Sequence, residues 1–226
     1  MAIKVLVSGY ENVGKTTLIS KIDDALIINC DNKEFTIQRL YAEFREGYKG
    51  VNSFITFLDE KIKAYKESTK KLPKYIIIDT ITHLYTQLVK FNNEVYQNFN
   101  IHSNINLDTL KLNDFFDEIV KKGISVVIVA HSKIDEKKGK HIIPSQGQFR
   151  DSGSFLSVCN EAIYISRERN DKGVMEHLVH LVTDGSTPCR SLMDHPQPKV
   201  EFNSFDVNKW LSDIASFKQE NTKFRL

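Results

Sequence analysis

Short runs of apolar residues recur along the first part of the chain, and longer segments of mixed polarity separate them. The runs cover residues 3–7, 25–29, 75–78 and 124–130, and Tyr75-Ile76-Ile77-Ile78 contains the most β-branched residues. Runs of this length that are rich in β-branched residues are typical of buried strands. We therefore predict a strand at each run, with residues 75–78 near the centre of a sheet.

Several of the intervening segments have apolar residues at every third or fourth position, which indicates amphipathic helices. In residues 51–68, for example, Val51, Phe54 and Leu58 fall on one face. The predicted helices cover residues 15–24, 51–68, 81–91, 107–121 and 205–217.

Two polar segments show no clean period, and we predict long loops there. They are the Asn-rich segment 92–106 and the segment 133–153. Farther on, residues 161–167 and 175–183 flank a turn-forming Asn170-Asp171-Lys172-Gly173, which predicts an antiparallel hairpin.

Alternating strands and helices that are followed by a hairpin indicate an α/β fold. We expect a mainly parallel central sheet that is flanked by helices and has antiparallel strands at one edge. We assign residues 1–200 to this core and residues 201–226 to a C-terminal helix and tail.

Composition narrows the functional classes only slightly. The net charge is +2, so bulk charge does not indicate a nucleic-acid partner, and any such partner must be inferred from local patches. Cys30, Cys159 and Cys189 lie far apart, without a CxxC pair, which suits a reducing cytosol rather than a zinc site or disulfide framework. Because no signal peptide or membrane-spanning run is found, we expect a cytoplasmic protein.

The turn between the first strand and the first helix carries the strongest motif. Residues 9–16 read GYENVGKT and match G-x-x-x-x-G-K-[ST] at every fixed position. The glycines let successive backbone N–H groups point at phosphate oxygens, and Lys15 can reach the β- and γ-phosphates. The predicted nucleotide-binding residues are Gly9, Tyr10, Glu11, Asn12, Val13, Gly14, Lys15, Thr16 and Thr17.

A magnesium site is predicted beside this loop. Asp79 ends the β-branched strand and has the position of a Walker B carboxylate, so Asp79 and the Thr16 hydroxyl are the expected Mg²⁺ ligands. The alternative is that Asp79 caps the following helix. Thr80 is the expected neighbour that supports the metal ligands.

Hydrolysis also needs a group that orients water and groups that respond to the γ-phosphate. Asp31, after the second strand, is the first candidate for the water, and Glu34 is the second. His131 ends a strand and could sense the γ-phosphate, and Arg190 could stabilise charge or contact DNA. Each of these residues also has a non-catalytic interpretation: Asp31 and Glu34 as solvated loop carboxylates, His131 as a structural histidine, and Arg190 as a surface arginine.

The order of these parts resembles the RecA-like ATPase core: an N-terminal P-loop, a carboxylate after the second strand, IIID-Thr, and a strand ending in His-Ser. It is most similar to the small phage "core-only" RecA/Rad-type proteins that bind single-stranded DNA and promote annealing. The resemblance covers roughly residues 1–195. It implies a RecA-like P-loop fold, ATP and Mg²⁺ as cofactors, and Lys15, Thr16 and Asp79 as their ligands.

The resemblance also implies a rate of ATP hydrolysis and a set of DNA and protein partners. Asp31 stands where the family usually has a glutamate, and its shorter side chain implies slow turnover. Segments 92–106 and 133–153 would be the two DNA-contacting loops, and a single-strand-binding protein and further copies of the chain would be protein partners. A phage protein would act in the host cytoplasm. Because the sequence opens on the first strand, we expect no tether of the kind through which recombinases polymerise, which argues against a stable filament. The DNA-binding candidates are Lys133, Lys137, Lys138, Lys140, Phe149 and Arg150.

Other classes of P-loop protein stay open. Ser132-Lys133-Ile134-Asp135 comes close to the guanine-reading N-K-x-D of GTPases, although the D-x-x-G of a GTPase switch is absent after Asp79. A small-molecule kinase would need an Arg-rich lid, for which Arg167 and Arg169 are poor candidates. The third alternative is a nucleotide-dependent switch that turns over slowly without DNA.

Overall fold

The computed structural model describes residues 1–31, 34, 39–44, 47–147 and 154–222. Five α-helices lie in this part of the chain, with bounds α1 Lys15–Ile19, α2 Val51–Thr69, α3 Ile81–Val95, α4 Phe99–Lys121 and α5 Val207–Thr222. Its strands are β1 Lys4–Gly9, β2 Ala25–Asn29, β3 Tyr41–Glu43, β4 Tyr75–Asp79, β5 Ser125–His131, β6 Lys133–Asp135, β7 Lys140–Ile142, β8 Glu161–Arg169, β9 Met175–His180 and β10 Lys199–Glu201.

The main sheet has eight strands in the order β10-β9-β8-β1-β5-β4-β2-β3. Strand β1 lies between β8 and β5 and is parallel to both. Strands β5, β4, β2 and β3 continue the parallel sheet, while β9 and β10 are antiparallel additions at the other edge. The predicted α/β fold, with a mainly parallel sheet and antiparallel edge strands, is confirmed.

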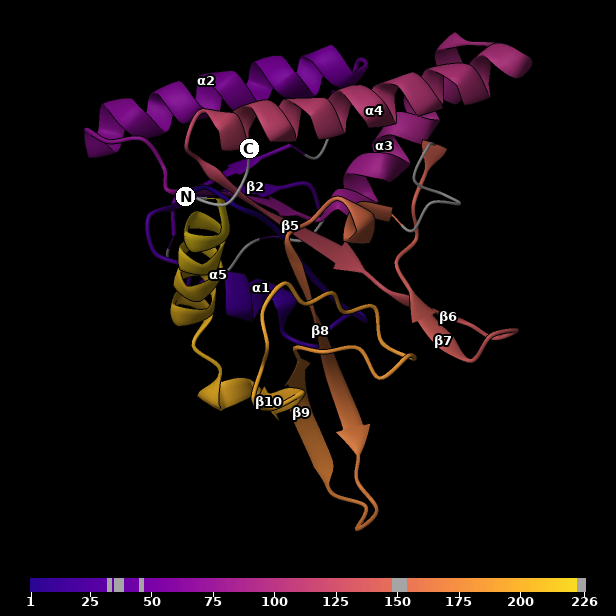
Figure 1. Ribbon diagram of the computed structural model, residues 1–226. Helices are drawn as coiled ribbons and strands as arrows, with labels where there is room; N and C mark the ends of the chain where they lie inside the picture. The colour runs from indigo at the N-terminus through magenta and orange to yellow at the C-terminus, as the bar shows by residue number, and fades with distance from the viewer. Residues whose placement is uncertain (32–33, 35–38, 45–46, 148–153, 223–226) are drawn as a thin grey trace.

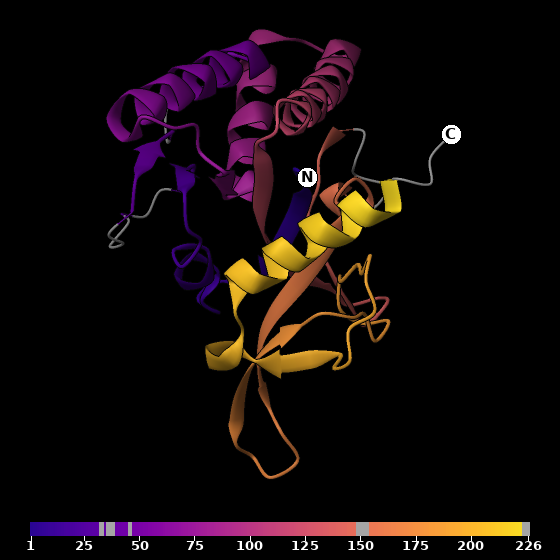
Figure 2. The same cartoon turned by 60° about the vertical axis from the view of Figure 1, so that its left-hand side comes forward.

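Helices cover both faces of this sheet. Helices α2, α3 and α4 lie on one face, and α1 and α5 lie on the other (Figure 1, Figure 2). Side chains of β4 alternate between the two layers: Ile76 and Ile78 pack under α2–α4, and Ile77 packs with Leu18 and Trp210 on the other face. Both faces of the inner strands are therefore buried, which explains why these strands read as continuous apolar runs.

The predicted loop at residues 92–106 is wrong, because α3 continues to Val95 and α4 begins at Phe99. Asn92 is buried in α3, and its amide donates to the Leu88 carbonyl (2.9 Å) and to Asp108 of α4 (3.1 Å). Polar side chains with partners of this kind can lie in a helix–helix contact. The high content of asparagine therefore led to a loop being predicted where the chain is mostly helical.

Several other predictions need adjustment. The first helix ends at Ile19 rather than near residue 24, and the irregular stretch after β2 contains the short edge strand β3. The predicted loop 133–153 begins as a hairpin, in which β6 and β7 pair outside the main sheet and project from the body (Figure 1). Helix α5 continues to Thr222. No helix of the described residues is long and apolar enough to cross a membrane.

Candidate nucleotide-binding site

The loop between β1 and α1 approaches its neighbours so closely that both motif glycines are required. A Cβ atom on Gly9 would lie 2.5 Å from the backbone oxygen of Ile165 in β8. Gly14 has φ +94°, and a Cβ there would lie 3.0 Å from the Phe202 ring. The predicted P-loop thus needs glycine for close packing as well as for its backbone conformation.

Lys15 is held inside the loop that it follows. Only 5% of the residue is exposed, and its ammonium donates to the backbone oxygens of Gly9 (2.9 Å) and Tyr10. Nζ also lies 3.3 Å from Nδ1 of His131 at the end of β5. A positive charge is therefore fixed where the carboxyl ends of β1 and β5 meet.

Thr16 and Asp79 meet as predicted for a magnesium site. The Thr16 hydroxyl donates to Oδ2 of Asp79 over 2.9 Å. The N-cap of α3 is Thr80, whose hydroxyl accepts the N–H of His83, so Asp79 is not occupied with capping. A carboxylate and a hydroxyl at this distance suit Mg²⁺, which prefers oxygen ligands.

Burial controls the charge of Asp79. Desolvation raises the pKa of this carboxyl to about 6, although the Thr16 hydrogen bond and the charge of Lys15 act in the opposite direction. The nearby Asp31 charge raises it further. A divalent cation would stabilise the ionised carboxylate that burial disfavours.

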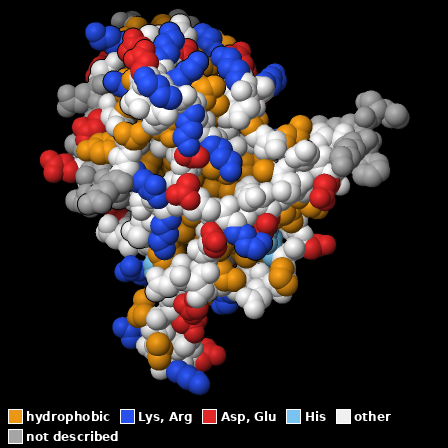
Figure 3. All heavy atoms as spheres, turned by 90° about the vertical axis from the view of Figure 1, so that its left-hand side faces the viewer, with side chains coloured by type: hydrophobic (Ala, Val, Ile, Leu, Met, Phe, Trp, Pro, Cys, Tyr) orange, Lys and Arg blue, Asp and Glu red, His pale blue; other side chains and the backbone are white. Residues whose placement is uncertain are grey.

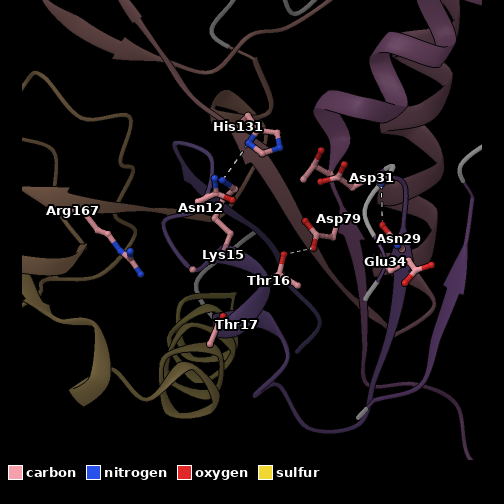
Figure 4. Close-up of a pocket in the computed structure, with 12 residues that line it drawn as sticks. Asn12, Lys15, Thr16, Thr17, Asn29, Asp31, Glu34, Asp79, His131 and Arg167 are labelled. Atoms are coloured by element: carbon pink, nitrogen blue, oxygen red, sulfur yellow. Dashed lines mark hydrogen bonds between the residues drawn. The ribbon is translucent and has the colours of Figure 1, made fainter. Parts of the chain in front are cut away.

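These groups line a cavity of about 350 Å³ at the carboxyl ends of β1, β2, β4 and β5 (Figure 4). Ligands in open α/β sheets bind at this edge. The lining residues are Asn12, Gly14, Lys15, Thr16, Thr17, Asn29, Asp31, Glu34, Asp79, Thr80, His131 and Arg167. The other predicted loop residues do not line the cavity. The backbone carbonyls of Gly9 and Tyr10 accept from Lys15, and that of Val13 accepts from His177. Glu11 is exposed.

Asp31, the first candidate for orienting water, lines this cavity, as does Glu34. The backbone N–H of Asp31 donates to the Asn29 side chain over 3.0 Å, and its carboxylate lies 3.5 Å from Nε2 of His83. His83 stands in the first turn of α3 and was missed by sequence reasoning, because only the fold brings that turn beside the end of β2.

His131 is neutral in this setting. Burial, followed by the charges of Lys15 and His83, lowers the pKa of the imidazole to about 4. Its backbone N–H donates to the Thr82 hydroxyl over 3.0 Å, which ties the end of β5 to α3. His131 can therefore act at neutral pH as a hydrogen-bonding group, but not as a source of positive charge.

The predicted Arg190 is not brought to the cavity. Its guanidinium donates to the backbone oxygens of Ser157 (2.6 Å) and Leu156 (3.4 Å), and its backbone pairs with Ala162. Arg167 lines the cavity instead, two residues beyond the Ile165 that pairs with Gly9. The sequence does not reveal this pairing, because β1 and β8 are far apart in the chain.

The antiparallel part of the sheet also supports the P-loop. His177 of β9 lies with Nε2 2.7 Å from the Val13 carbonyl oxygen, and its ring stacks on Phe202 with a centroid distance of 3.8 Å. Phe202 is in turn close to the Gly14 backbone. Sequence reasoning missed this support as well.

The predicted DNA-binding lysines lie together on the β6–β7 hairpin. Lys133, Lys137, Lys138 and Lys140 are all exposed. Phe149 and Arg150 lie outside the described residues. Asp135 accepts the backbone N–H of Lys137 (3.1 Å) and lies 3.9 Å from the Lys138 ammonium. Neither Lys133 nor Asp135 lines the cavity, which does not favour a guanine-reading role.

Comparison with known proteins finds a matching family model and structures of similar fold. A family model described as an AAA domain matches residues 1–191. The structure is similar to that of a KaiC-like protein from the hyperthermophilic archaeon Pyrococcus horikoshii OT3, with a TM-score of 0.50 and 13% sequence identity over 88% of this chain and 89% of that chain. At this identity the likeness concerns the fold, and it agrees with the predicted RecA-like architecture. A search of curated proteins found no match.

Proposed function

This chain belongs to the AAA domain family, and from that premise we propose that it is a Mg²⁺-dependent ATPase that acts on single-stranded DNA in annealing or recombination. The observation that supports the ATPase most directly is the hydrogen bond of 2.9 Å between Thr16 and Asp79, beside the buried ammonium of Lys15. A hydroxyl, a carboxylate and a lysine in this relation are what a nucleotide triphosphate with its metal requires.

The proposed roles follow from chemistry. Thr16 and Asp79 would hold Mg²⁺, which supplies charge stabilisation at the phosphate oxygens when it is bound. Lys15 supplies a second positive charge in the same cavity, and Arg167 supplies a third at its rim. Asp31 would orient the attacking water. Because its side chain is one methylene shorter than that of glutamate, we expect slow turnover.

The proposal for DNA rests on the β6–β7 hairpin. Its four exposed lysines can contact phosphates, and electrostatic contacts of this kind dominate binding to single strands. The face in Figure 3, on the other side of the molecule, also carries Lys and Arg side chains in its upper part, with acidic side chains among them. A single-strand-binding protein and further copies of the chain complete the proposed partners, and the cytoplasm is the proposed compartment.

The decisive experiment measures ATP and GTP hydrolysis by the purified protein in Mg²⁺, with and without single-stranded DNA. ATP turnover that DNA stimulates is the expected result. Lys15→Ala is the matched control for contaminating activity, because loss of a charge at the phosphates is expected to reduce turnover by about 100-fold.

Other results would replace the proposal. A preference for GTP without a DNA effect would indicate a GTPase. Turnover only with a small phosphate acceptor would indicate a kinase. Nucleotide binding without turnover would indicate a switch, and a protein partner would then be the next object of study.

A further inference from the structure

A second cavity, of about 690 Å³, lies where the start of α5 meets β10 and the segment between β9 and β10. It shares no lining residue with the nucleotide-binding cavity in the described part of the chain. Its volume falls within the range of about 300–1,000 Å³ that is typical of ligand sites. The cavity is therefore a separate candidate binding site.

Apolar and aromatic side chains form one part of its wall. The rings of Phe205 and Trp210 lie with their centroids 5.9 Å apart, and Leu181 and Val200 line the cavity as well. Trp210 is buried, and its indole N–H donates to the Glu161 carboxylate over 2.7 Å, which fixes the orientation of the ring. An aromatic group of a ligand would find a preformed contact here.

His195 brings an unpaired nitrogen to the same wall. Its side chain is only 9% exposed, and its Nε2 lies 2.8 Å from Oε1 of Glu161. A carboxylate can only accept, so Nε2 donates, and Nδ1 of the neutral imidazole is an acceptor. Nδ1 has no hydrogen-bond partner among the residues that the structure describes, and it keeps accessible surface. Such an acceptor favours a ligand that carries an N–H group.

The charged groups of this cavity are mostly acidic. Four carboxylates and one ammonium line it, namely those of Asp194, Glu201, Asp206, Asp213 and Lys209. The ammonium of Lys209 is already paired, because it lies 2.5 Å from Oδ2 of Asp213. Asp194 and Glu201 are exposed and have no ion-pair partner within the described ranges. The unneutralised carboxylates favour a cationic ligand.

The C-terminal segment, residues 223–226, has the composition that such a cavity favours. It follows the described part of the chain and reads Lys-Phe-Arg-Leu. In an extended peptide alternate side chains point to opposite sides, so the two cations would lie on one side and the two apolar groups on the other. A guanidinium pairs well with a carboxylate, and a phenyl ring packs well against other aromatic rings.

A molecule with α5 intact cannot place this segment in its own cavity. Trp210 and Thr222 lie twelve positions apart on α5, which corresponds to about 18 Å along the helix. Four extended residues span at most about 14 Å. Helix α5 also runs away from β10 toward the amino terminus, where the Lys218 ammonium donates to the Ala2 carbonyl oxygen over 2.9 Å (Figure 1). The segment must therefore come from another molecule.

We propose that the cavity binds the C-terminal segment of a second copy of the chain. Phe224 packs against Phe205 and Trp210, Arg225 pairs with the free carboxylates, and a backbone N–H of the segment donates to Nδ1 of His195. Because the contact joins two different surfaces, each added copy leaves one segment and one cavity free unless a ring closes. This association gives the proposed oligomer a defined contact, and it requires neither nucleotide nor DNA.

Sedimentation equilibrium of the full chain, without nucleotide, tests the contact. The average mass of the wild type should rise with concentration beyond that of a dimer, and deletion of residues 223–226 should keep the protein monomeric. Phe224→Ala should weaken association by about tenfold or more, because it removes a buried aromatic group. Gln219→Ala, at an exposed position before the segment, should match the wild type.

A mixing experiment separates this contact from other modes of association. One variant lacks residues 223–226 and keeps the cavity, while Asp194→Lys/Glu201→Lys keeps the segment and carries a repelling cavity. Each should be monomeric alone, and an equal mixture should form a 1:1 complex and nothing larger. Asp59→Lys/Glu60→Lys changes the charge equally at exposed positions of α2 and should associate like the wild type. Circular dichroism verifies the folding of all variants.

Trp210 reports on the cavity directly, because it is the only tryptophan in the chain. A synthetic peptide of residues 219–226 should change its fluorescence in the variant that lacks residues 223–226. A peptide with serine in place of Phe224 and Leu226 keeps both cations and should bind at least about tenfold more weakly. Equal binding of the two peptides would overturn the proposal, since charge alone would then explain the attraction.

The other outcomes also decide the matter. A mixture that forms no 1:1 complex would overturn the proposed contact, and so would self-association that survives deletion of residues 223–226. A monomeric wild type whose Trp210 fluorescence responds to micromolar spermidine would overturn it in favour of a site for a small cation. A wild type that associates as expected but hydrolyses no ATP would overturn the proposed ATPase and leave this contact standing.

Discussion

Nε2 of His177 lies 2.7 Å from the carbonyl oxygen of Val13, although 164 positions separate the two residues in the chain. This contact links β9, an antiparallel strand next to the edge of the sheet, to the phosphate-binding loop. The imidazole donates to the carbonyl, and the Phe202 ring supports it from the other side. The conformation of the P-loop therefore depends on residues that would never contact the nucleotide themselves.

His177→Phe should weaken nucleotide binding, because it keeps the stacking ring but removes the hydrogen bond to the loop. The loss of about 1 kcal/mol corresponds to roughly a fivefold weaker affinity. Isothermal titration calorimetry with ATP and Mg²⁺ measures it. Lys172→Ala, at the exposed turn of the same hairpin, is the control, and equal affinities for wild type and His177→Phe would contradict the proposed support.

Asp79 should make stability depend on pH. Burial raises its folded-state pKa to about 6, above the ordinary value of 3.8. The folded state therefore binds the extra proton between these values, so the ionised group opposes folding above pH 6, and the penalty disappears as the pH falls toward 4. Without Mg²⁺, Asp79→Asn should raise the free energy of unfolding at pH 7.5 by up to about 3 kcal/mol.

Urea denaturation with a chelator present, at pH 7.5 and pH 4, measures this effect as the difference between variant and wild type. Asp59→Asn, at an exposed position on α2, is the control. A gain of the same size at both pH values would show that the substitution acts through something other than the charge of Asp79.

The lysines of the β6–β7 hairpin should carry the DNA contacts. Replacing Lys137, Lys138 and Lys140 together by alanine should weaken binding to single-stranded DNA and reduce the salt dependence, by about 0.7 in the logarithmic slope for each phosphate that is no longer neutralised. Fluorescence anisotropy at several salt concentrations measures both. The control variant replaces Lys63 and Lys66 of α2 and Lys111 of α4 by alanine, and so changes the net charge by the same amount away from the hairpin. Similar losses of DNA affinity in the two triple variants would argue against the hairpin.

Glu161 should be important for stability, because it is a buried carboxylate with several partners. Its exposed fraction is 1%, and its oxygens accept from Nε2 of His195 (2.8 Å) and from Nε1 of Trp210 (2.7 Å). Glu161→Ala leaves these donors unpaired and should cost about 3 kcal/mol of unfolding free energy. Glu161→Gln should cost less, since an amide retains one acceptor.

Trp210 is the only tryptophan in the chain, so its fluorescence follows unfolding and reports on the Glu161 contact directly. Glu136→Ala, at an exposed position after β6, controls for loss of a carboxylate. Unchanged stability in Glu161→Ala would mean that the buried network contributes nothing net to folding.

Some features could be predicted because they are local in the sequence. The P-loop lies within eight consecutive residues, and the Thr16–Asp79 contact follows once the two motifs are assigned to the carboxyl ends of parallel strands of one sheet, where β5 separates β1 from β4. The inner strands were also recognisable, because a strand that is buried on both faces must be apolar throughout. For these features, a few consecutive residues are enough to identify both the element and its chemical role.

Other features depend on pairings that short windows do not contain. Arg167 and His177 reach the site through the registers of β8 with β1 and with β9, and His83 reaches it because α3 starts beside the end of β2. Asn92 misled the prediction, since its amide is satisfied by Asp108, and the sequence does not show that the helix containing Asp108 packs against Asn92. Polarity alone cannot distinguish a solvated asparagine from a buried, hydrogen-bonded one.

The position of β1 between β5 and β8 has a consequence for synthesis on the ribosome. The P-loop strand emerges before the other strands of the sheet, but its second edge has no partner until residues 161–165 have been made. Contacts across such separations form slowly, and an unpaired strand edge invites wrong association. A nascent chain that stalls before β8 would carry the complete phosphate-binding motif without the strand against which Gly9 packs, so nucleotide binding should be gained late in translation.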